Sequence, residues 1–246
     1  MLSGDDYIEA MNVSAADREC RRAFQNLATS LVPPGSAVFD FGCGPGVDAK
    51  LYTNRGLRVG AYDIDARMCE SFAVNCAAEL ARGAVHLETG DYQGFLQRRT
   101  SSDGSKYRLI TANFAPVNLV PNVHELFVKF STMLTPGGQV LASILNPMFA
   151  GDMRYAWWWR NGVRLCVHGS YSVPGGQAPI RRWLPKKLAE QAAPAFGLAA
   201  VYRGLPMDET EGSLPRRLRP AVLRDWPSLA SCRFLFILFR HTANHK

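Results

Sequence analysis

An apolar stretch that runs directly into a glycine-rich loop constrains this chain most. Residues 38–41 read Val-Phe-Asp-Phe, and glycines follow at Gly42, Gly44 and Gly46 before a helical segment over residues 47–55. Glycine is needed where the backbone takes a positive φ or approaches a ligand closely, and the amides of a helix N-terminus attract polar or anionic groups. The sequence therefore predicts a strand, a ligand-holding loop and a helix, in that order.

The spacing of the glycines distinguishes this loop from a dinucleotide-binding fingerprint. A dinucleotide site has a glycine three residues after Gly44, where this chain has Val47. The pattern here is instead Gly-x-Gly-x-Gly, preceded by Asp40. In this respect the chain resembles the class I S-adenosylmethionine-dependent methyltransferases, whose first motif is an apolar strand, an acidic residue and Gly-x-Gly-x-Gly.

Three further motifs carry the same resemblance, and together the four span residues 36–145 in order. Asp63 ends the next apolar segment, 17 residues after Gly46, close to the separation that a βαβ unit imposes. The resemblance implies that Asp63 binds the ribose hydroxyls of the cofactor and that the Gly-Asp-Tyr at residues 90–92 contacts adenine. The Pro-Gly-Gly at residues 136–138 matches the turn that leads into the fifth strand.

The resemblance implies an α/β fold, a Rossmann-like three-layer sandwich whose seven-stranded sheet is mostly parallel with an antiparallel last strand. The 246 residues suffice for one such domain, so we expect a single class I methyltransferase domain over 1–246. Within it, residues 1–35 would form an N-terminal helical cap and residues 146–183 an aromatic-rich substrate insertion or lid. Residues 163–171 and 178–183 could pair as a small antiparallel ribbon inside this insertion.

The expected cofactor is S-adenosyl-L-methionine, and the resemblance places its contacts at the ends of the first four strands. The glycines would let the backbone pass beneath the methionine part, with Asp40 supporting the loop. In many relatives a tyrosine near the N-terminus reaches the methionine end; Tyr7 could do so here, or could belong to a frayed terminus. The residues predicted to bind the cofactor are Tyr7, Asp40, Gly42, Cys43, Gly44, Gly46, Asp63, Ile64, Asp91, Tyr92, Asn113 and Phe114.

The segment after the fourth predicted strand disfavours four methyltransferase subclasses. Enzymes that methylate exocyclic amines of bases typically have Pro-Pro and an aromatic residue here, whereas residues 113–116 read Asn-Phe-Ala-Pro. No cysteine nucleophile lies nearby, as cytosine-5 enzymes would require, and the first glutamate, Glu125, comes too late for the glutamate pair of arginine methyltransferases. Metal-dependent catechol-type enzymes have carboxylates where this chain has Asn113 and Asn146, so no metal is expected.

The insertion is the best source of acceptor contacts, because aromatic-rich segments beyond the carboxyl ends of a sheet form walls of small-molecule pockets. Alternatively, its three consecutive tryptophans only attach the subdomain to the core. A hydroxyl acceptor usually needs a base, whereas a neutral amine or an acidic heterocycle need not have one. Substrate contacts are predicted at Asn118, Met148, Trp157 and Trp158, and the candidate bases are His168, Tyr171 and His124, the last equally explained as an exposed helix residue.

These features predict methyl transfer to an O or N atom of a small-molecule acceptor of biosynthetic type, secondary metabolites included. Two alternatives remain open: a tRNA or rRNA methyltransferase, and a non-catalytic S-adenosylmethionine-binding protein. Partner expectations follow the charge, since residues 181–246 hold 12 Lys and Arg against 5 Asp and Glu and account for the whole net charge of +7. The cluster Arg216, Arg217, Arg219 and Arg224 is either a solvated basic face or a binding surface for an acidic carrier protein, a phosphorylated substrate or, less favoured, RNA.

Targeting and redox signals are weak. Residues 1–12 lack the apolar core of a signal peptide, and the apolar run at residues 234–239 is too short to span a bilayer, so we expect a cytoplasmic protein. The six cysteines show no Cys-x-x-Cys spacing and are expected to be free thiols. The oligomeric state cannot be read from these patterns.

Overall fold

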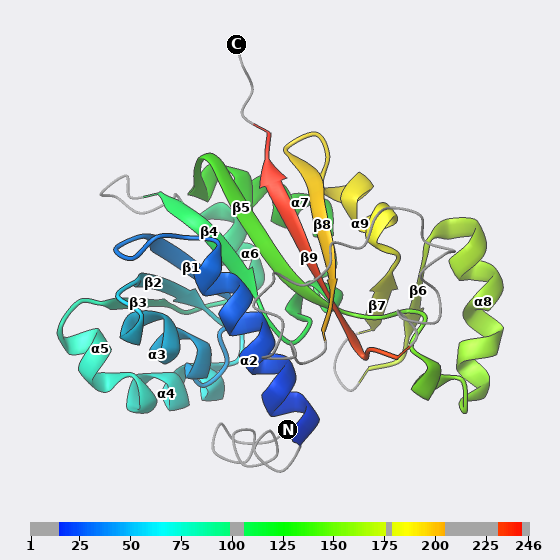
Figure 1. Cartoon of the computed structure of the whole chain (residues 1–246), viewed down its shortest axis with the longest axis horizontal. Coiled ribbons are helices and arrows are strands. Elements are labelled where there is room, and N and C mark those ends of the chain that lie inside the picture. The colour runs from blue at the N-terminus through cyan, green and yellow to red at the C-terminus, as the bar shows by residue number, and fades with distance from the viewer. Residues whose placement is uncertain (1–14, 99–105, 176–178, 205–230, 243–246) are drawn as a thin grey trace, which may run out of the picture.

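The computed structural model describes residues 15–98, 106–175, 179–204 and 231–242. Tyr7 and the arginine cluster at residues 216–224 lie outside these ranges. A seven-stranded sheet with the order β3-β2-β1-β4-β5-β9-β8 forms the centre of the described structure (Figure 1). The strands are β1 (Ala37–Phe41), β2 (Arg58–Tyr62), β3 (Val85–Glu88), β4 (Tyr107–Ala112), β5 (Leu134–Leu145), β8 (Phe196–Arg203) and β9 (Phe234–His241).

The predicted strand directions are confirmed. Strands β1 to β5 pair in parallel, and β9 runs antiparallel to both of its neighbours, β5 and β8. The sheet order reverses around β1, which lies between β2 and β4. In open parallel sheets ligands bind beyond the carboxyl ends of the strands at such a reversal, so the fold itself points to the end of β1.

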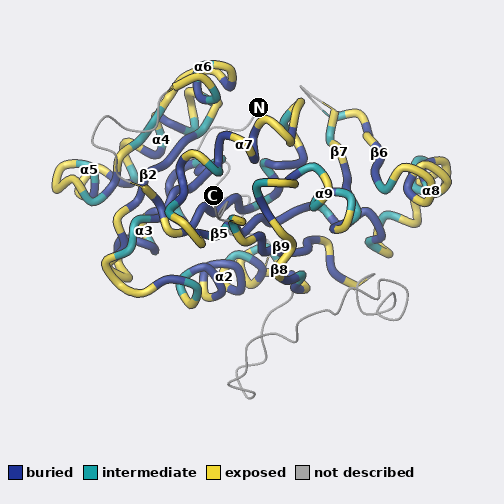
Figure 2. Tube along the Cα trace, turned by 90° about the horizontal axis from the view of Figure 1, so that it is seen from above, coloured by how far each residue is buried: buried dark blue, intermediate teal, exposed yellow. Residues whose placement is uncertain are grey.

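Helices cover both faces of the sheet and give the expected three layers. Along each strand alternate side chains point to opposite faces, so Val38 packs in one core and Phe39 in the other. The views in Figures 1 and 2 show α2 on one side of the strands, and α6 and α7 lie on the opposite side. One layer comprises α2 (Ala15–Ser30), α3 (Val47–Asn54), α4 (Ala66–Asn75) and α5 (Ala77–Ala81), and the other α6 (Tyr92–Gln97), α7 (Val123–Met133) and α9 (Pro185–Ala192).

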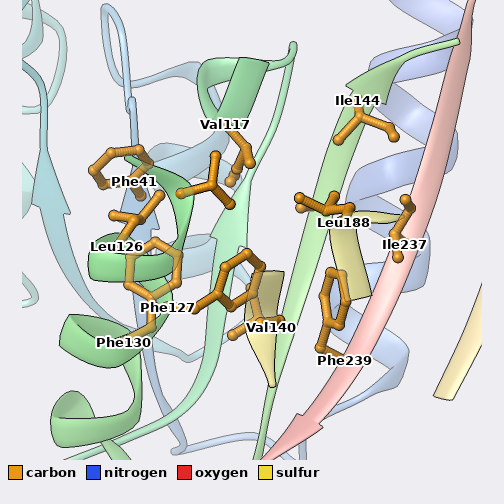
Figure 3. Close-up of a cluster of buried hydrophobic side chains, with 14 of the residues drawn as sticks. Phe41, Val117, Leu126, Phe127, Phe130, Val140, Ile144, Leu188, Ile237 and Phe239 are labelled. Carbon is orange, nitrogen blue, oxygen red and sulfur yellow. The ribbon is translucent and has the colours of Figure 1, made fainter. Parts of the chain in front are cut away.

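The core beneath α7 follows from its apolar spacing. Leu126, Phe127 and Phe130 recur at helical intervals and are buried against the sheet (Figure 3). The ring of Phe127 meets Phe239 of β9 edge to face at a centroid distance of 4.9 Å. Figure 3 also shows how Val140 of β5 and Phe239 approach this helix layer, which ties the last strand to the parallel part of the sheet.

The insertion differs in part from its prediction. It contains the short 3-10 helix η2 (Ala150–Asp152), then α8 (Ala156–His168) and an antiparallel ribbon of β6 (Ser170–Val173) and β7 (Ile180–Trp183). The predicted strand over residues 163–171 is therefore wrong for its first part, which is helical. The helix ends at Gly169, whose φ of +67° suits glycine, and only there does the ribbon begin.

Candidate functional site

A cavity of about 270 Å³ lies at the carboxyl ends of β1, β2 and β4. This is the position at which the strand order reverses, so the backbone topology and the cavity agree. Among the residues that line it, Asp63 carries the only carboxylate, and Lys, Arg and His are lacking. The lining consists of Phe41, Gly42, Gly44, Tyr62, Asp63, Ile64, Met68, Tyr92, Asn113, Phe114, Pro116, Leu119, Val120 and Pro121.

Two glycines of the loop are required by what lies beside them. Gly42 has a φ of +72°, and a Cβ built there would lie 2.6 Å from the Cβ of Pro116, which also lines the cavity. Gly46 has a φ of +85°, and its Cβ would lie 2.7 Å from the Cys76 sulfur. Any side chain at either position would displace its neighbour, so the loop holds its shape only with glycine.

The Asp63 carboxylate is held in place by backbone amides. Gly44 donates its N–H to Asp63 Oδ2 at 2.8 Å, and the N–H of Asp65 donates to Oδ1 at 2.9 Å. Burial raises the pKa of Asp63 above its ordinary value, while these two amide bonds act in the opposite direction and favour the ionised form. One carboxyl group thus fixes the glycine loop and also lines the cavity.

The chain bends sharply after β4 to form the opposite wall. Phe114 and Ala115 have φ values of 58° and 68°, a conformation that non-glycine residues rarely adopt. Asn113 stabilises the bend, because its Oδ1 accepts the Phe114 N–H at 2.9 Å. The Phe114 ring then packs edge to face on Phe234 at 5.4 Å, with the Arg21 guanidinium 4.6 Å from its centroid.

A buried polar network beneath the cavity connects it to α2. Asp48, in the first turn of α3, accepts hydrogen bonds at its Oδ1 from Gln25 at 2.6 Å and from Arg21 at 2.9 Å. Its Oδ2 accepts from Asn113 Nδ2 at 2.9 Å. The side chain of Asn113 is therefore oriented by a carboxylate that also anchors the N-terminal helix.

Asp40 lies under the glycine loop and does not line the cavity. Its side chain is buried, and its Oδ1 accepts a hydrogen bond from Thr111 at 2.9 Å across the β1–β4 pair. Burial, together with the nearby charge of Asp48, raises the pKa of Asp40 to about 8. Asp40 thus joins the ends of β1 and β4, the two strands that bound the cavity.

Comparison with known proteins identifies the chain's family. A family model described as a methyltransferase domain matches residues 13–172, well over half of the sequence. The chain belongs to this methyltransferase family. Its sheet order and cavity position are those expected of a class I S-adenosylmethionine-dependent methyltransferase. No curated protein matches the sequence significantly.

Solved structures share the fold of this methyltransferase at low sequence identity. A putative methyltransferase from Haloferax volcanii, in complex with the Trm112 methyltransferase activator, has a TM-score of 0.64 and 14% identity over 97% of this chain and 94% of its own. The CcbJ methyltransferase from Streptomyces caelestis has a TM-score of 0.61 and 17% identity over 91% and 96% of the two chains. The 1,6-didemethyltoxoflavin-N1-methyltransferase from Burkholderia thailandensis has a TM-score of 0.60 and 16% identity over 97% of this chain and 84% of its own.

Most of the cofactor residues predicted for the methyltransferase from its motifs lie at the cavity, but some do not. Cys43 and Gly46 are buried within the loop and do not line the cavity. Asp91 lies outside the lining as well and caps α6, because its Oδ1 accepts the Gly94 N–H at 2.6 Å. The lining also includes residues outside the predicted set, notably Tyr62, Leu119, Val120 and Pro121. The predicted residues that line the cavity are Gly42, Gly44, Asp63, Ile64, Tyr92, Asn113 and Phe114.

None of the three candidate bases of the methyltransferase lines this cavity. Tyr171 is buried and its hydroxyl donates to the Pro147 carbonyl at 3.1 Å, while burial raises its pKa to about 12. His124 lies on a separate concavity along α6 and α7, with Nδ1 3.0 Å from the Gln191 carbonyl oxygen. His168 is exposed in the last turn of α8.

The four predicted substrate contacts pack the methyltransferase's insertion onto the end of β5 instead of lining the cavity. Asn118 is buried, donates to the Arg181 carbonyl at 2.5 Å and accepts the Leu145 N–H at 3.1 Å. Trp158 donates its indole N–H to the Pro147 carbonyl at 3.2 Å. Met148 is part of the core, and Trp157 packs against Tyr171 at a centroid distance of 6.2 Å.

The described residues also bear on metal binding, membrane insertion and disulfide bonding. No cluster of three or more His, Cys, Asp or Glu side chains suited to a metal ion occurs within them. None of the helices in these parts of the chain combines the length and hydropathy needed to cross a membrane. All six cysteines are free thiols.

Proposed function

We propose that the protein transfers a methyl group from S-adenosylmethionine to an O or N atom of a small biosynthetic molecule. The observation that carries this proposal is the small, mainly apolar cavity with one carboxylate, because a large polyanionic acceptor would favour a basic rim and the lining has no Lys or Arg. Two fold neighbours support it by what their names state: one is a toxoflavin-pathway N-methyltransferase, and another belongs to echinomycin biosynthesis.

The residues present fit S-adenosylmethionine. Asp63 offers two carboxylate oxygens, which suits the pair of ribose hydroxyls, and Gly44 leaves open space beside the cavity where a side chain would otherwise stand. Ile64, Met68 and Tyr92 provide apolar surface for a flat base. Gly42, Gly44 and Asn113 would then contact the methionine part of the cofactor. When bound, the cofactor supplies an electrophilic methyl group on a positively charged sulfur.

The chain's own contribution is alignment and exclusion of water. Phe114, Pro116, Leu119, Val120 and Pro121 form an apolar wall, so they can hold an acceptor near the cofactor while keeping water from the reacting atoms. Phe114 is fixed by the bend after β4 and by its ring contact with Phe234, so this wall is preorganised. Such positioning needs no covalent participation by the protein.

The lining also bears on the class of acceptor. No histidine lines the cavity in the described structure, and Asp63 already accepts two amide hydrogen bonds. An acceptor atom that is nucleophilic without a protein base, such as a neutral amine or the anion of an acidic hydroxyl or heterocycle, therefore fits this site best. His124, His168 and Tyr171 would have to move to act as bases.

The test is methyl transfer from labelled S-adenosylmethionine to three separate pools: small metabolites, total RNA and protein. We expect label in the small-molecule pool, at an amine or acidic heteroatom. Label confined to intact RNA, with binding that falls steeply as salt increases, would instead support the alternative tRNA or rRNA function. Cofactor binding without label in any pool would support the non-catalytic alternative.

The basic C-terminal quarter of the chain suits an acidic carrier protein as the bearer of the acceptor. The triple variant of Arg216, Arg217 and Arg219 to glutamine tests this. Reduced transfer to carrier-bound acceptor, with unchanged transfer to the free acceptor, would support the carrier. Equal transfer to both by the variant would exclude a required role for these arginines.

A further inference from the structure

Helix α8 has a second apolar face that the described part of the chain leaves exposed to solvent. It lies at one end of the molecule beside β6, apart from the large sheet (Figure 1), and most of it is exposed in Figure 2. Asn161 and Leu165 form its buried side. On the opposite side, Trp159, Val163 and Val167 are 60%, 72% and 69% exposed.

The exposed apolar residues form one stripe. Trp159, Val163, Cys166 and Val167 follow at intervals of four, three and one residues, which places them on one side of a helix; we call these four residues the α8 ridge. Surface helices normally show polar side chains on the face turned away from the core. Met153 and Tyr155, just before the helix, are also exposed.

The charges beside the ridge have a single sign. Arg160 and Arg164 come next to the ridge around the helix, and Arg154 stacks on the Tyr155 ring with its guanidinium carbon 4.8 Å from the centroid. Residues 153–168 contain no aspartate or glutamate. The surface of α8 is therefore apolar along the ridge and basic beside it.

We propose that the α8 ridge is a docking surface for an anionic lipid bilayer. Helices that lie in a membrane interface combine a face of Trp and aliphatic residues with arginine or lysine beside it. Trp and Tyr suit the headgroup level because they are apolar with one polar atom, and each nearby basic residue adds attraction to anionic lipids.

The charge pattern disfavours a symmetric contact between the α8 ridges of two copies of this chain. Two α8 ridges packed together would bring no acidic side chain against the arginines of either copy, because the segment has none. Like charges opposite each other oppose association. An anionic surface has the complementary charge.

Vesicle flotation of the full chain tests the proposal, with phosphatidylcholine vesicles compared with phosphatidylcholine–phosphatidylglycerol vesicles. We expect binding to the anionic vesicles and a loss of about tenfold or more in Val163→Glu, because an apolar side chain that is buried on binding becomes charged. The matched control is Val74→Glu on α4, where the valine is 77% exposed and lies outside the ridge. S-adenosylhomocysteine binding should be unchanged in both variants, which shows that each is folded.

Each other outcome overturns the proposal. These outcomes are absence of binding to anionic vesicles by the wild type, or equal binding by Val163→Glu and the wild type. A wild-type dimer in sedimentation that Val163→Glu dissociates, with no vesicle binding, would assign the ridge to a second copy. Binding of the ridge to a purified acidic protein, again without vesicle binding, would assign it to a protein partner.

Discussion

Asn113 donates a hydrogen bond from Nδ2 to Asp48 Oδ2 at 2.9 Å, although the two residues lie 65 positions apart in sequence. The other oxygen of the same carboxylate accepts from Arg21 and Gln25 of α2. Asn113 lines the cavity, whereas Asp48 lies behind it. The N-terminal helix and the cavity wall therefore share one buried carboxylate, so a substitution in either should alter the packing of the other.

Asp48→Asn tests this connection. The substitution leaves the Arg21 guanidinium without its buried carboxylate and weakens the hold on Asn113, so we expect a loss of stability of about 2–4 kcal/mol and weaker S-adenosylhomocysteine binding. Denaturant unfolding and calorimetric titration measure the two effects. Glu190→Gln is the control, since Glu190 forms only an exposed ion pair with Lys187 and should change neither. Unchanged binding in a destabilised Asp48→Asn protein would show that the carboxylate anchors α2 alone.

Asp40 predicts a pH dependence of stability. Its pKa is raised from an ordinary value near 4 to about 8 in the folded protein, because it is buried near the charged Asp48. The folded state then binds this proton more tightly than the unfolded state, so the contribution is fully present below pH 4 and is lost as the pH rises toward about 8. Asp40→Asn should remove this decline, by about 2 kcal/mol or more across the window. Urea unfolding at several pH values measures it, and parallel pH profiles for the two proteins would refute the assignment.

Gly42→Ala should damage both the fold and the cavity. The new Cβ would stand 2.6 Å from the Pro116 Cβ in a backbone with positive φ, so we expect a destabilisation of about 2 kcal/mol or more and weaker cofactor binding. Gly56→Ala provides a matched control, because Gly56 has a similar φ of +77° but open space around its Cβ. It should cost only about 1 kcal/mol from backbone strain and leave binding unchanged. Equal binding losses in the two variants would mean that contact with Pro116 is unimportant.

Asn118→Ala distinguishes packing from substrate contact. The side chain is buried and joins Leu145 at the end of β5 to Arg181 of β7, so its removal leaves a cavity and deprives the Leu145 N–H and the Arg181 carbonyl of this partner. We expect a loss of about 2–4 kcal/mol in unfolding free energy. Thermal unfolding and steady-state kinetics measure the outcome. Unaltered stability with a raised KM for the acceptor would instead restore the substrate contact predicted from sequence.

The sequence predicted the features that depend on local chain order. The glycine loop, Asp63 and the seven-stranded arrangement follow from motifs whose strand, turn and helix are neighbours in sequence, and the structure brings Gly42, Gly44 and Asp63 to one cavity. The Asp48 network could not be predicted in this way, because its partners lie 23 to 65 residues away and an acid in the first turn of a helix usually needs no partner beyond the helix dipole.

The insertion was the least predictable part. Helix α8 contains three tryptophans, Gly162 and two β-branched valines, all weaker helix formers than alanine or leucine, so its local pattern also suited a strand. The predicted acceptor contacts do not line the cavity for a related reason. The polar groups of Asn118, Trp158 and Tyr171 donate hydrogen bonds to backbone carbonyls within the fold. Tertiary packing determines these partners, and the local sequence does not indicate them.

Calorimetric titration with S-adenosylhomocysteine is the most direct test of the central claim that the cavity at the ends of β1, β2 and β4 holds the cofactor through Asp63. The wild type should bind, and Asp63→Ala should bind about 100-fold more weakly or worse, because two charge-assisted hydrogen bonds are lost. Asp91→Ala, which changes a neighbouring carboxylate outside the cavity lining, should retain binding within a few-fold. A folded wild type that does not bind, or an Asp63→Ala variant that binds equally well, would contradict the account.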